Sequence, residues 1–75
     1  MTLDYEGRLP VYVQLADILQ ARIEAGELAK GKMLPSESRL IQEFGTSRGT
    51  VRKAIEVLRE RGLVDTVAQR GTFVI

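Results

Sequence analysis

Two amphipathic segments joined by a three-residue link constrain the fold of this chain more than any other feature. The first is a short helix predicted over residues 36–44, with Ser36 as its N-cap and three apolar side chains on its inward face. The second begins at Arg48, directly after the link formed by residues 45–47. A link of this length permits only a sharp crossing between two helices. The sequence therefore predicts a helix-turn-helix.

The second of these helices, predicted over residues 48–61, carries an apolar face and a basic face. Ser47 suits its N-cap, and Gly62 suits the left-handed residue that often ends a helix. The inward stripe has helical spacing and consists of Val51, Ala54, Ile55 and Leu58. The outward side of the first two turns carries Arg48, Gly49, Arg52 and Lys53. Because glycine lowers helix stability, Gly49 indicates a surface that a partner approaches closely.

A further helix is predicted over residues 11–25, because Pro10 suits a helix entry and Gly26 suits a helix stop. Its apolar stripe, expected to lie on the core, consists of Tyr12, Leu15, Ile18, Leu19 and Ile23. A partner-binding or membrane-surface role for this helix is an alternative, but its polar face mixes both charge signs, which does not favour an anionic membrane. Residues 1–9 before it are predicted to form a flexible N-terminal arm.

The C-terminal part of the chain predicts a β-hairpin. Two β-rich segments flank a turn and indicate strands within about residues 64–75. Gln69 and Arg70 would stand at the tip of this hairpin, with Gly71 beside the turn. Between the first two helices, residues 26–35 predict a loop that contains a short strand.

With 75 residues, the chain has room for one domain and one small core. We therefore predict a single three-helix winged helix-turn-helix domain over residues 1–75, mainly α with a small β wing. The chain contains neither His nor Cys, so it lacks the usual transition-metal ligands, the commonest general base and the thiol nucleophile. We expect no enzymatic activity, no metal and no cofactor. A small enzyme using Ser47 or Thr50 with Lys53 is the weaker alternative, because no carboxylate completes a charge network.

Charge is unevenly distributed along the chain, although the net charge is only +1. Residues 1–45 contain five Lys or Arg against seven Asp or Glu, a net of −2, whereas residues 46–75 contain six against three, a net of +3. A slim, basic helix start suits the major groove of duplex DNA, about 12 Å wide, and its N-terminal dipole suits a phosphate. A basic hairpin tip suits a minor groove or a flanking phosphate. These features predict binding to double-stranded DNA.

Three motifs occur in order along the chain: Leu-Pro-Ser-Glu at 34–37, Phe-Gly-x-Ser-Arg-x-Thr-Val-Arg at 44–52, and Gly-Leu followed by Arg-Gly-Thr-Phe-Val within 62–74. With these motifs, residues 12–74 resemble the N-terminal winged-helix domain of the GntR family of bacterial transcription regulators. The resemblance implies operator binding, with the third helix in the major groove and the wing at the minor groove. It implies that the contacts come from Ser47, Arg48, Thr50 and Arg52, and from Gln69 to Gly71 in the wing.

Two positions and the length depart from the family pattern. Family members often have an arginine that contacts DNA directly after the Ser-Glu pair, where this chain has Ser38 followed by Arg39. Either Arg39 substitutes from a neighbouring angle or this contact is absent. Position 69, often glycine in the family, is Gln69, which offers a side-chain hydrogen bond in place of a bare backbone. Regulators of this family usually continue into an effector-binding, dimerising domain, so no small-molecule effector site is expected within this chain.

The sequence thus predicts a sequence-specific DNA-binding transcriptional regulator, for which a repressor is favoured and an activator stays open. The absence of Cys, of a signal-like segment and of any apolar run of membrane length predicts a soluble cytoplasmic protein with no membrane partner. The resemblance implies a bacterial protein, and DNA binding would locate it at the nucleoid. The candidate DNA-contacting residues are Ser36, Arg39, Thr46, Ser47, Arg48, Gly49, Thr50, Arg52, Lys53, Gln69, Arg70 and Gly71.

Several alternatives stay open at the level of sequence. A homodimer, including one that forms only on DNA, is compatible with the chain, as are action with another subunit and a place at the head of a longer regulator. The alternative function is a winged-helix protein-interaction module whose basic face meets an acidic partner. Near the end of the third helix, Arg59 and Arg61 are expected to be structural, through the helix dipole and pairing with Glu56 and Glu60.

Overall fold

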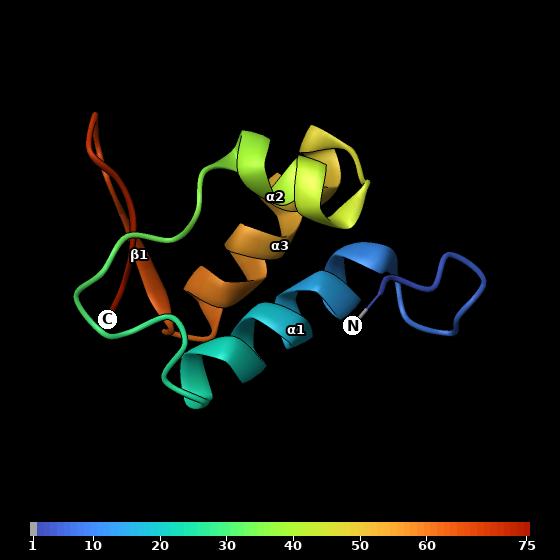
Figure 1. Cartoon of the computed structure of the whole chain (residues 1–75), viewed down its shortest axis with the longest axis horizontal. Coiled ribbons are helices and arrows are strands. Elements are labelled where there is room, and N and C mark those ends of the chain that lie inside the picture. Colours follow the sequence, from blue (N-terminus) through green and yellow to red (C-terminus); the bar gives the residue numbers. More distant parts are fainter. Residues whose placement is uncertain (1) are drawn as a thin grey trace.

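The computed structural model describes residues 2–75, in which three helices precede a two-stranded antiparallel hairpin (Figure 1). The elements are α1 (Val11–Glu24), α2 (Glu37–Phe44), α3 (Arg48–Glu60), β1 (Val64–Val67) and β2 (Gly71–Val74). α3 packs on both α1 and α2, and the start of α3 and the tip of the hairpin lie along the upper edge of Figure 1. This is the predicted winged helix-turn-helix, and each predicted helix is confirmed to within one residue at either end.

Side-chain caps begin both α2 and α3, and a glycine ends α2. Oγ of Ser36 accepts a hydrogen bond from the backbone N–H of Arg39, and Oγ of Ser47 accepts one from that of Thr50, both at 3.1 Å. Gly45 ends α2 with a φ of 62°, a left-handed conformation that glycine adopts without a steric penalty. Both predicted caps are confirmed, and the link itself is set by Gly45 and the Ser47 cap.

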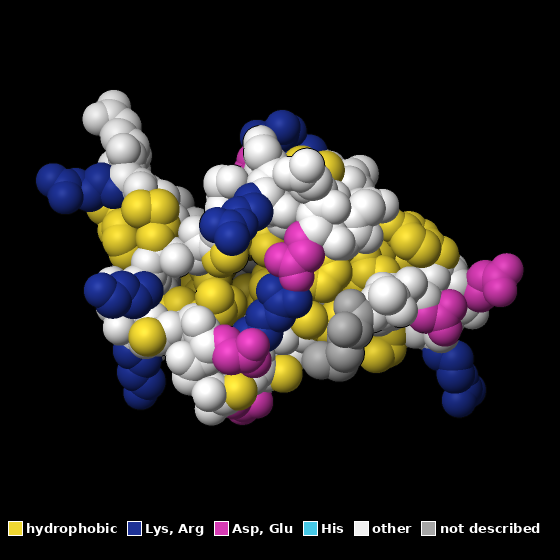
Figure 2. Space-filling view, viewed as in Figure 1, with side chains coloured by type: hydrophobic (Ala, Val, Ile, Leu, Met, Phe, Trp, Pro, Cys, Tyr) yellow, Lys and Arg dark blue, Asp and Glu magenta, His cyan; other side chains and the backbone are white. Residues whose placement is uncertain are grey.

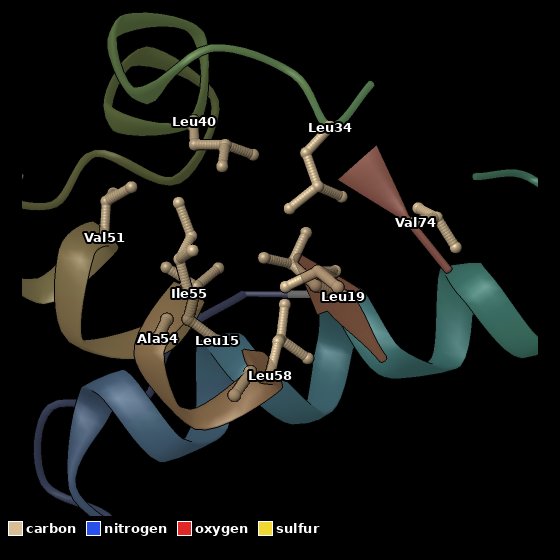
Figure 3. Close-up of a cluster of buried hydrophobic side chains, with 11 residues drawn as sticks. Leu15, Leu19, Leu34, Leu40, Val51, Ala54, Ile55, Leu58 and Val74 are labelled. Atoms are coloured by element: carbon tan, nitrogen blue, oxygen red, sulfur yellow. The ribbon is translucent and has the colours of Figure 1, made fainter. Parts of the chain in front are cut away.

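The core lies where α1, α3, the start of α2 and the base of the wing meet (Figure 3). Its buried members are Leu15, Ala16, Leu19, Leu34, Leu40, Val51, Ala54, Ile55, Leu58, Val64 and Val74. The whole predicted stripe of α3 belongs to this cluster and is confirmed. In α1, Tyr12 and Ile23 are only half-buried, while Ala16 and Leu34 join the core without having been predicted. Because this packing fixes the inner face of α3, the opposite face of its first turns is held outward.

The wing is anchored at its base and exposed at its tip. Val64 pairs with Val74, and both are buried, whereas Val67 pairs with Gly71 next to the turn. The N–H of Arg70 donates to the carbonyl of Val67 at 3.0 Å and closes the turn. The predicted hairpin is therefore confirmed, with its tip free to meet a partner.

Two residues of the wing adopt a positive φ. Gln69 has a φ of 65° and is the sole non-glycine residue within 2–75 in this region of conformational space. Gly71 has a φ of 127°, and a Cβ at this position would lie 3.0 Å from Sδ of Met33. The positive φ thus favours glycine at position 71, where a side chain would also displace Met33, whereas Gln69 carries strain that a glycine would not. The glycine expected here from the family pattern would fit this backbone.

The segment that leads into α2 lies along the outer edge of β2. The N–H of Leu34 donates to the carbonyl of Thr72 at 2.8 Å, and Met33 forms a single antiparallel bridge with Phe73. The short strand predicted within residues 26–35 is therefore reduced to this bridge. The bridge ties the wing to the start of α2.

The described part of the N-terminal arm, residues 2–9, folds back onto α1. The N–H of Asp4 donates to Oε1 of Gln14 at 2.8 Å, and Nε2 of Gln14 donates to the carbonyls of Asp4 and Leu9 at 2.7 and 2.8 Å. One glutamine side chain of α1 thus satisfies several backbone groups of the arm, and the flexibility of the arm stays a prediction. Met1, which the prediction also included, lies outside the described residues.

Candidate nucleic-acid interface

The start of α3 presents two arginines with a gap between them. Arg48 and Arg52, hereafter the arginine pair, are one helical turn apart, and their side chains are 52% and 65% exposed. Gly49 is exposed as well, and a Cβ added to it would meet, among the described residues, only Oγ of Ser47 at 3.9 Å. The packing of the chain does not require glycine at this position. The missing side chain leaves room for a large ligand close to the helix.

One carboxylate, that of Glu37 at the start of α2, holds both arginines. Nη1 of Arg48 donates to Oε1 of Glu37 at 2.9 Å, and Nε of Arg52 donates to Oε2 at 3.0 Å. Glu37 is outside the predicted set and was noted from the sequence as the last residue of the Leu-Pro-Ser-Glu motif. The partners are 11 and 15 residues apart along the chain, so no helical periodicity could have revealed the contact.

The pKa of the Glu37 carboxyl lies below its ordinary value, chiefly because the carboxylate accepts a hydrogen bond from Arg52. Partial burial acts in the opposite direction, and the hydrogen bond from Arg48 adds to the lowering of the pKa. The carboxylate is therefore charged at neutral pH. A negative charge thus lies between the two guanidinium groups.

Three other residues of the predicted set are engaged or covered. Oγ1 of Thr50 accepts a hydrogen bond from the hydroxyl of Ser47 at 3.0 Å. Nζ of Lys53 lies 5.5 Å from the centroid of the Tyr12 ring, so this ammonium group makes a cation–π contact with α1. Thr46 is buried, and its hydroxyl has no hydrogen-bond partner within residues 2–75. The hydroxyl of Thr46 would reach a ligand only if its side chain turned outward.

The remaining predicted residues flank α3 on two sides. Ser36 and Arg39 are exposed at the start of α2, where the hydroxyl of Ser36 serves the cap. Gln69 and Arg70 are exposed at the wing tip, and Gly71 is half-buried beside them. The predicted residues thus lie at the starts of α2 and α3 and, separately, at the tip of the wing.

A groove of about 600 Å³ separates α3 from the wing. Leu34 and Ile55 contribute apolar surface to it. The polar side chains that line it are Ser36, Glu37, Arg52, Glu56, Arg59, Thr66 and Thr72. The groove therefore extends from Arg52 to the wing, and Arg59 is a lining residue that the predicted set did not include.

The two arginines near the end of α3 differ from the prediction in their partners. Nη1 of Arg61 donates to Oδ1 of Asp17 at 2.8 Å and to Oε1 of Gln20 at 2.7 Å, and both acceptors belong to α1. Arg59 forms no ion pair within residues 2–75. The predicted pairing with the glutamates of α3 is therefore wrong. α1 offers Arg61 two acceptors, which the sequence order alone could not show.

On the face shown in Figure 2, Lys and Arg side chains project at the top, at the left beside the wing, near the centre and from the arm at the right. Asp and Glu side chains lie among them, near the centre and on the arm. None of the helices within residues 2–75 is long and apolar enough to cross a membrane. In the same part of the chain, no group of three His, Cys, Asp or Glu side chains is placed to hold a metal ion.

Three helices, a capped link, an exposed arginine pair and a wing define a winged helix-turn-helix domain of the kind found in regulatory proteins. The sequence profile described as "Bacterial regulatory proteins, gntR family" matches residues 11–74. The chain therefore belongs to the gntR family of bacterial regulatory proteins. This membership confirms the resemblance and agrees with the prediction that the chain is not an enzyme.

Two curated relatives and one solved structure illustrate the membership. The chain is 44% identical over 68 residues to the mannosyl-D-glycerate transport/metabolism system repressor MngR of Escherichia coli (strain K12), covering 91% of this chain and 28% of MngR. It is 39% identical over 74 residues to the HTH-type transcriptional repressor NagR of Bacillus subtilis (strain 168), covering 99% of this chain and 30% of NagR. The fold is similar to that of AraR(DBD) in complex with operator ORX1, with a TM-score of 0.86, 35% identity, and coverage of 100% of this chain and 99% of that chain.

Proposed function

We propose that this chain is the DNA-binding domain of a bacterial transcriptional repressor and recognises an operator duplex sequence-specifically. In this proposal α3 enters the major groove and the wing meets the adjacent minor groove. The observation that carries it is the exposed arginine pair on either side of Gly49 at the capped start of α3. It is supported by AraR(DBD), which has a similar fold and is described in complex with operator DNA, and by MngR and NagR, which are named repressors.

The chemistry of the interface assigns different tasks to different residues. The guanidinium groups of Arg48 and Arg52 can each donate two parallel hydrogen bonds to O6 and N7 of a guanine. The hydroxyls of Ser47 and Thr50, with the free N–H groups at the start of α3, suit phosphate oxygens. Gly49 permits the backbone to approach the groove.

The wing and α2 would supply the flanking contacts. Arg70 at the wing tip suits the minor groove, where a narrow A·T-rich segment attracts a guanidinium group, and Gln69 offers an amide beside it. Arg39 suits a phosphate beside the major groove. The complete proposed set is Ser36, Arg39, Thr46, Ser47, Arg48, Gly49, Thr50, Arg52, Lys53, Gln69, Arg70 and Gly71.

Two copies of the chain are proposed to act on one operator, as a homodimer that forms on DNA or through other parts of a longer regulator. Helix-turn-helix dimers bind half-sites about 34–36 Å apart, and a single small domain has few contacts with which to bind tightly. Operator binding places the protein in the bacterial cytoplasm, at the nucleoid. The chain spans less than a third of the length of MngR and NagR, so this assignment concerns the DNA-binding part alone.

Selection of bound duplexes from a random pool tests the proposal. The expected result is one enriched motif with G·C pairs at fixed positions, and an inverted repeat if two copies bind together. A variant carrying both Arg48→Ala and Arg52→Ala should recover no motif, whereas Arg61→Ala should recover the same motif as the unmodified chain. Failure of the folded, unmodified chain to enrich any motif would contradict the proposal. Binding to an acidic polypeptide in its place would favour the protein-interaction alternative.

A further inference from the structure

Glu37 occupies a fixed position over the start of α3. It is the first residue of α2, the helix that Ser36 caps and that Leu40 anchors in the core one turn later. Each of its two carboxylate oxygens accepts a hydrogen bond from a different arginine, at 2.9 Å from Arg48 and 3.0 Å from Arg52. A single anchored carboxylate thus restrains both long side chains before any ligand arrives.

The two ion pairs leave most of the donors of the arginine pair free. A guanidinium group has five N–H donors. Arg52 uses its Nε, so the donors of both terminal nitrogens, at the outer end of a side chain that is 65% exposed, remain available. Two terminal donors match the paired acceptors O6 and N7 of a guanine. Glu37 therefore holds the inner side of the Arg52 guanidinium without blocking its outer edge.

The same carboxylate opposes indiscriminate attraction to DNA. Affinity for any duplex, whatever its sequence, comes mainly from phosphates that meet positive charges. Glu37 is charged, as its lowered pKa indicates, and lies between the two positive charges at the start of α3. It therefore weakens the attraction to phosphates, while the hydrogen bonds of a fixed guanidinium to a base remain possible.

We infer that Glu37 is a positioning residue for sequence discrimination, which orients Arg48 and Arg52 toward bases and lowers affinity for non-operator duplexes. The inference rests on the proposed function and adds to it a residue outside the set of proposed DNA contacts. In a purely structural role, Glu37 would stabilise the start of α2 through the helix dipole, and its loss would change thermal stability without changing discrimination.

α2 itself contains a matched control for this inference. Glu43, at the other end of α2, accepts a hydrogen bond from Nη2 of Arg22, which also lowers the pKa of that carboxyl. Arg22 belongs to α1, and its guanidinium lies 5.2 Å from the centroid of the Phe44 ring. Glu37→Gln and Glu43→Gln each remove one negative charge from α2, the first with two arginine–carboxylate pairs and the second with one. Only the first substitution releases the arginine pair.

The experiment compares two duplexes, the motif recovered by selection and a version in which its G·C pairs are exchanged for A·T pairs. Binding of each is measured over a range of salt concentrations for the unmodified chain and each variant, together with thermal unfolding. For Glu37→Gln we expect the preference for the selected duplex to fall about tenfold, with tighter binding to the altered duplex. Glu43→Gln should retain the preference. Glu37→Asp keeps the charge but shortens the side chain, so it should lower the preference without tighter binding to the altered duplex.

Each contrary outcome identifies what has failed. An unchanged preference in a folded Glu37→Gln variant, or an equal loss in Glu43→Gln, overturns the role of Glu37 and leaves the proposed function intact. Equal affinity of the unmodified chain for both duplexes overturns the proposed function and this inference together. If Glu37→Gln does not fold, the preference of Glu37→Asp decides the matter, and an unchanged preference there also overturns the inference.

Discussion

The two ends of α3 both carry arginine–carboxylate pairs, yet they serve different purposes. At the C-terminal end, Arg61 donates at 2.8 Å to Asp17, and its side chain is 33% exposed between α1 and α3. At the N-terminal end, Arg48 and Arg52 donate to Glu37 at similar distances, but their side chains are 52% and 65% exposed. The lengths of the ion pairs therefore do not distinguish a packing contact from a binding surface. The two are distinguished by the N–H donors of each arginine that remain free toward solvent.

The surroundings of each end reinforce this difference. Arg61 has a second acceptor, Gln20, on the same helix as its first, so its donors hold two elements of the fold together. The arginine pair shares one acceptor and stands beside Gly49, where no side chain fills the space. We expect substitutions at the C-terminal end to affect folding and substitutions at the N-terminal end to affect DNA binding.

The largest expected effect is on DNA binding by the variant that carries both Arg48→Ala and Arg52→Ala. Each bidentate contact to a base contributes about 1–3 kcal/mol, so the affinity for the selected duplex should fall by about 2–6 kcal/mol in total. Fluorescence anisotropy at fixed salt measures this loss. The midpoint of thermal unfolding should change little, because both side chains are exposed. If this variant unfolds at a lower temperature but binds the selected duplex with full affinity when folded, the two ends of α3 do not differ in function as proposed.

The next largest effect is expected for Gly49→Ala, which should weaken operator binding and stabilise the fold. A methyl group in a close interface costs about 1–3 kcal/mol, so operator affinity should fall. Alanine is the better helix former by up to about 1 kcal/mol, so the free energy of unfolding should rise. Titration calorimetry and chemical denaturation measure the two quantities on one sample. Unchanged affinity would show that DNA does not approach α3 at this point.

Removal of the packing contact should have a smaller effect, confined to folding. Arg61→Ala is expected to lower the free energy of unfolding by about 0.2–1 kcal/mol, the usual range for partly exposed ion pairs, with unchanged operator affinity. Urea denaturation monitored by circular dichroism measures the loss. A clear drop in DNA affinity with unaltered stability would place Arg61 at the interface instead.

The smallest expected effect is the dependence of stability on pH. Both α2 carboxyls, Glu37 and Glu43, have pKa values lowered by arginine partners. A carboxyl of this kind stabilises the fold above its unfolded pKa, near 4.5, and that contribution is lost as the pH falls through the lower folded value. The free energy of unfolding, measured by denaturation at neutral pH and at a pH well below 4.5, should therefore fall less for Glu37→Gln than for the unmodified chain. Equal losses would mean that the Glu37 pairs add nothing to folding.

Features set by local sequence were predictable. The caps at Ser36 and Ser47 depend on residues three positions away, and the stripe from Val51 to Leu58 depends on one helical period. For this reason the bounds of the helices and the outward position of the arginine pair followed from the sequence. The hairpin followed similarly, because its turn connects adjacent segments.

Features that depend on packing between distant segments were not predictable. The shared acceptor Glu37 reaches α3 only because the capped link folds α2 across it, and the burial of Thr46 has the same cause. The ring of Tyr12 beside Lys53 and the acceptors of Arg61 are supplied by α1, which no periodicity places next to α3. The hydrogen bonds of Gln14 to the backbone of the arm were not predictable for the same reason, because no periodicity places the arm beside this side chain.

The account is tested most directly by nuclear magnetic resonance of the arginine Nε–Hε groups while the selected duplex is added to the chain. We predict large shifts for Arg48 and Arg52, and none of comparable size for Arg22 and Arg61, whose guanidinium groups hold elements of the fold together. Glycine and serine amides at the start of α3 should shift with the arginine pair. Shifts confined to Arg22 or Arg61, with the arginine pair unmoved, would contradict the claim that the start of α3 is the surface that reads DNA.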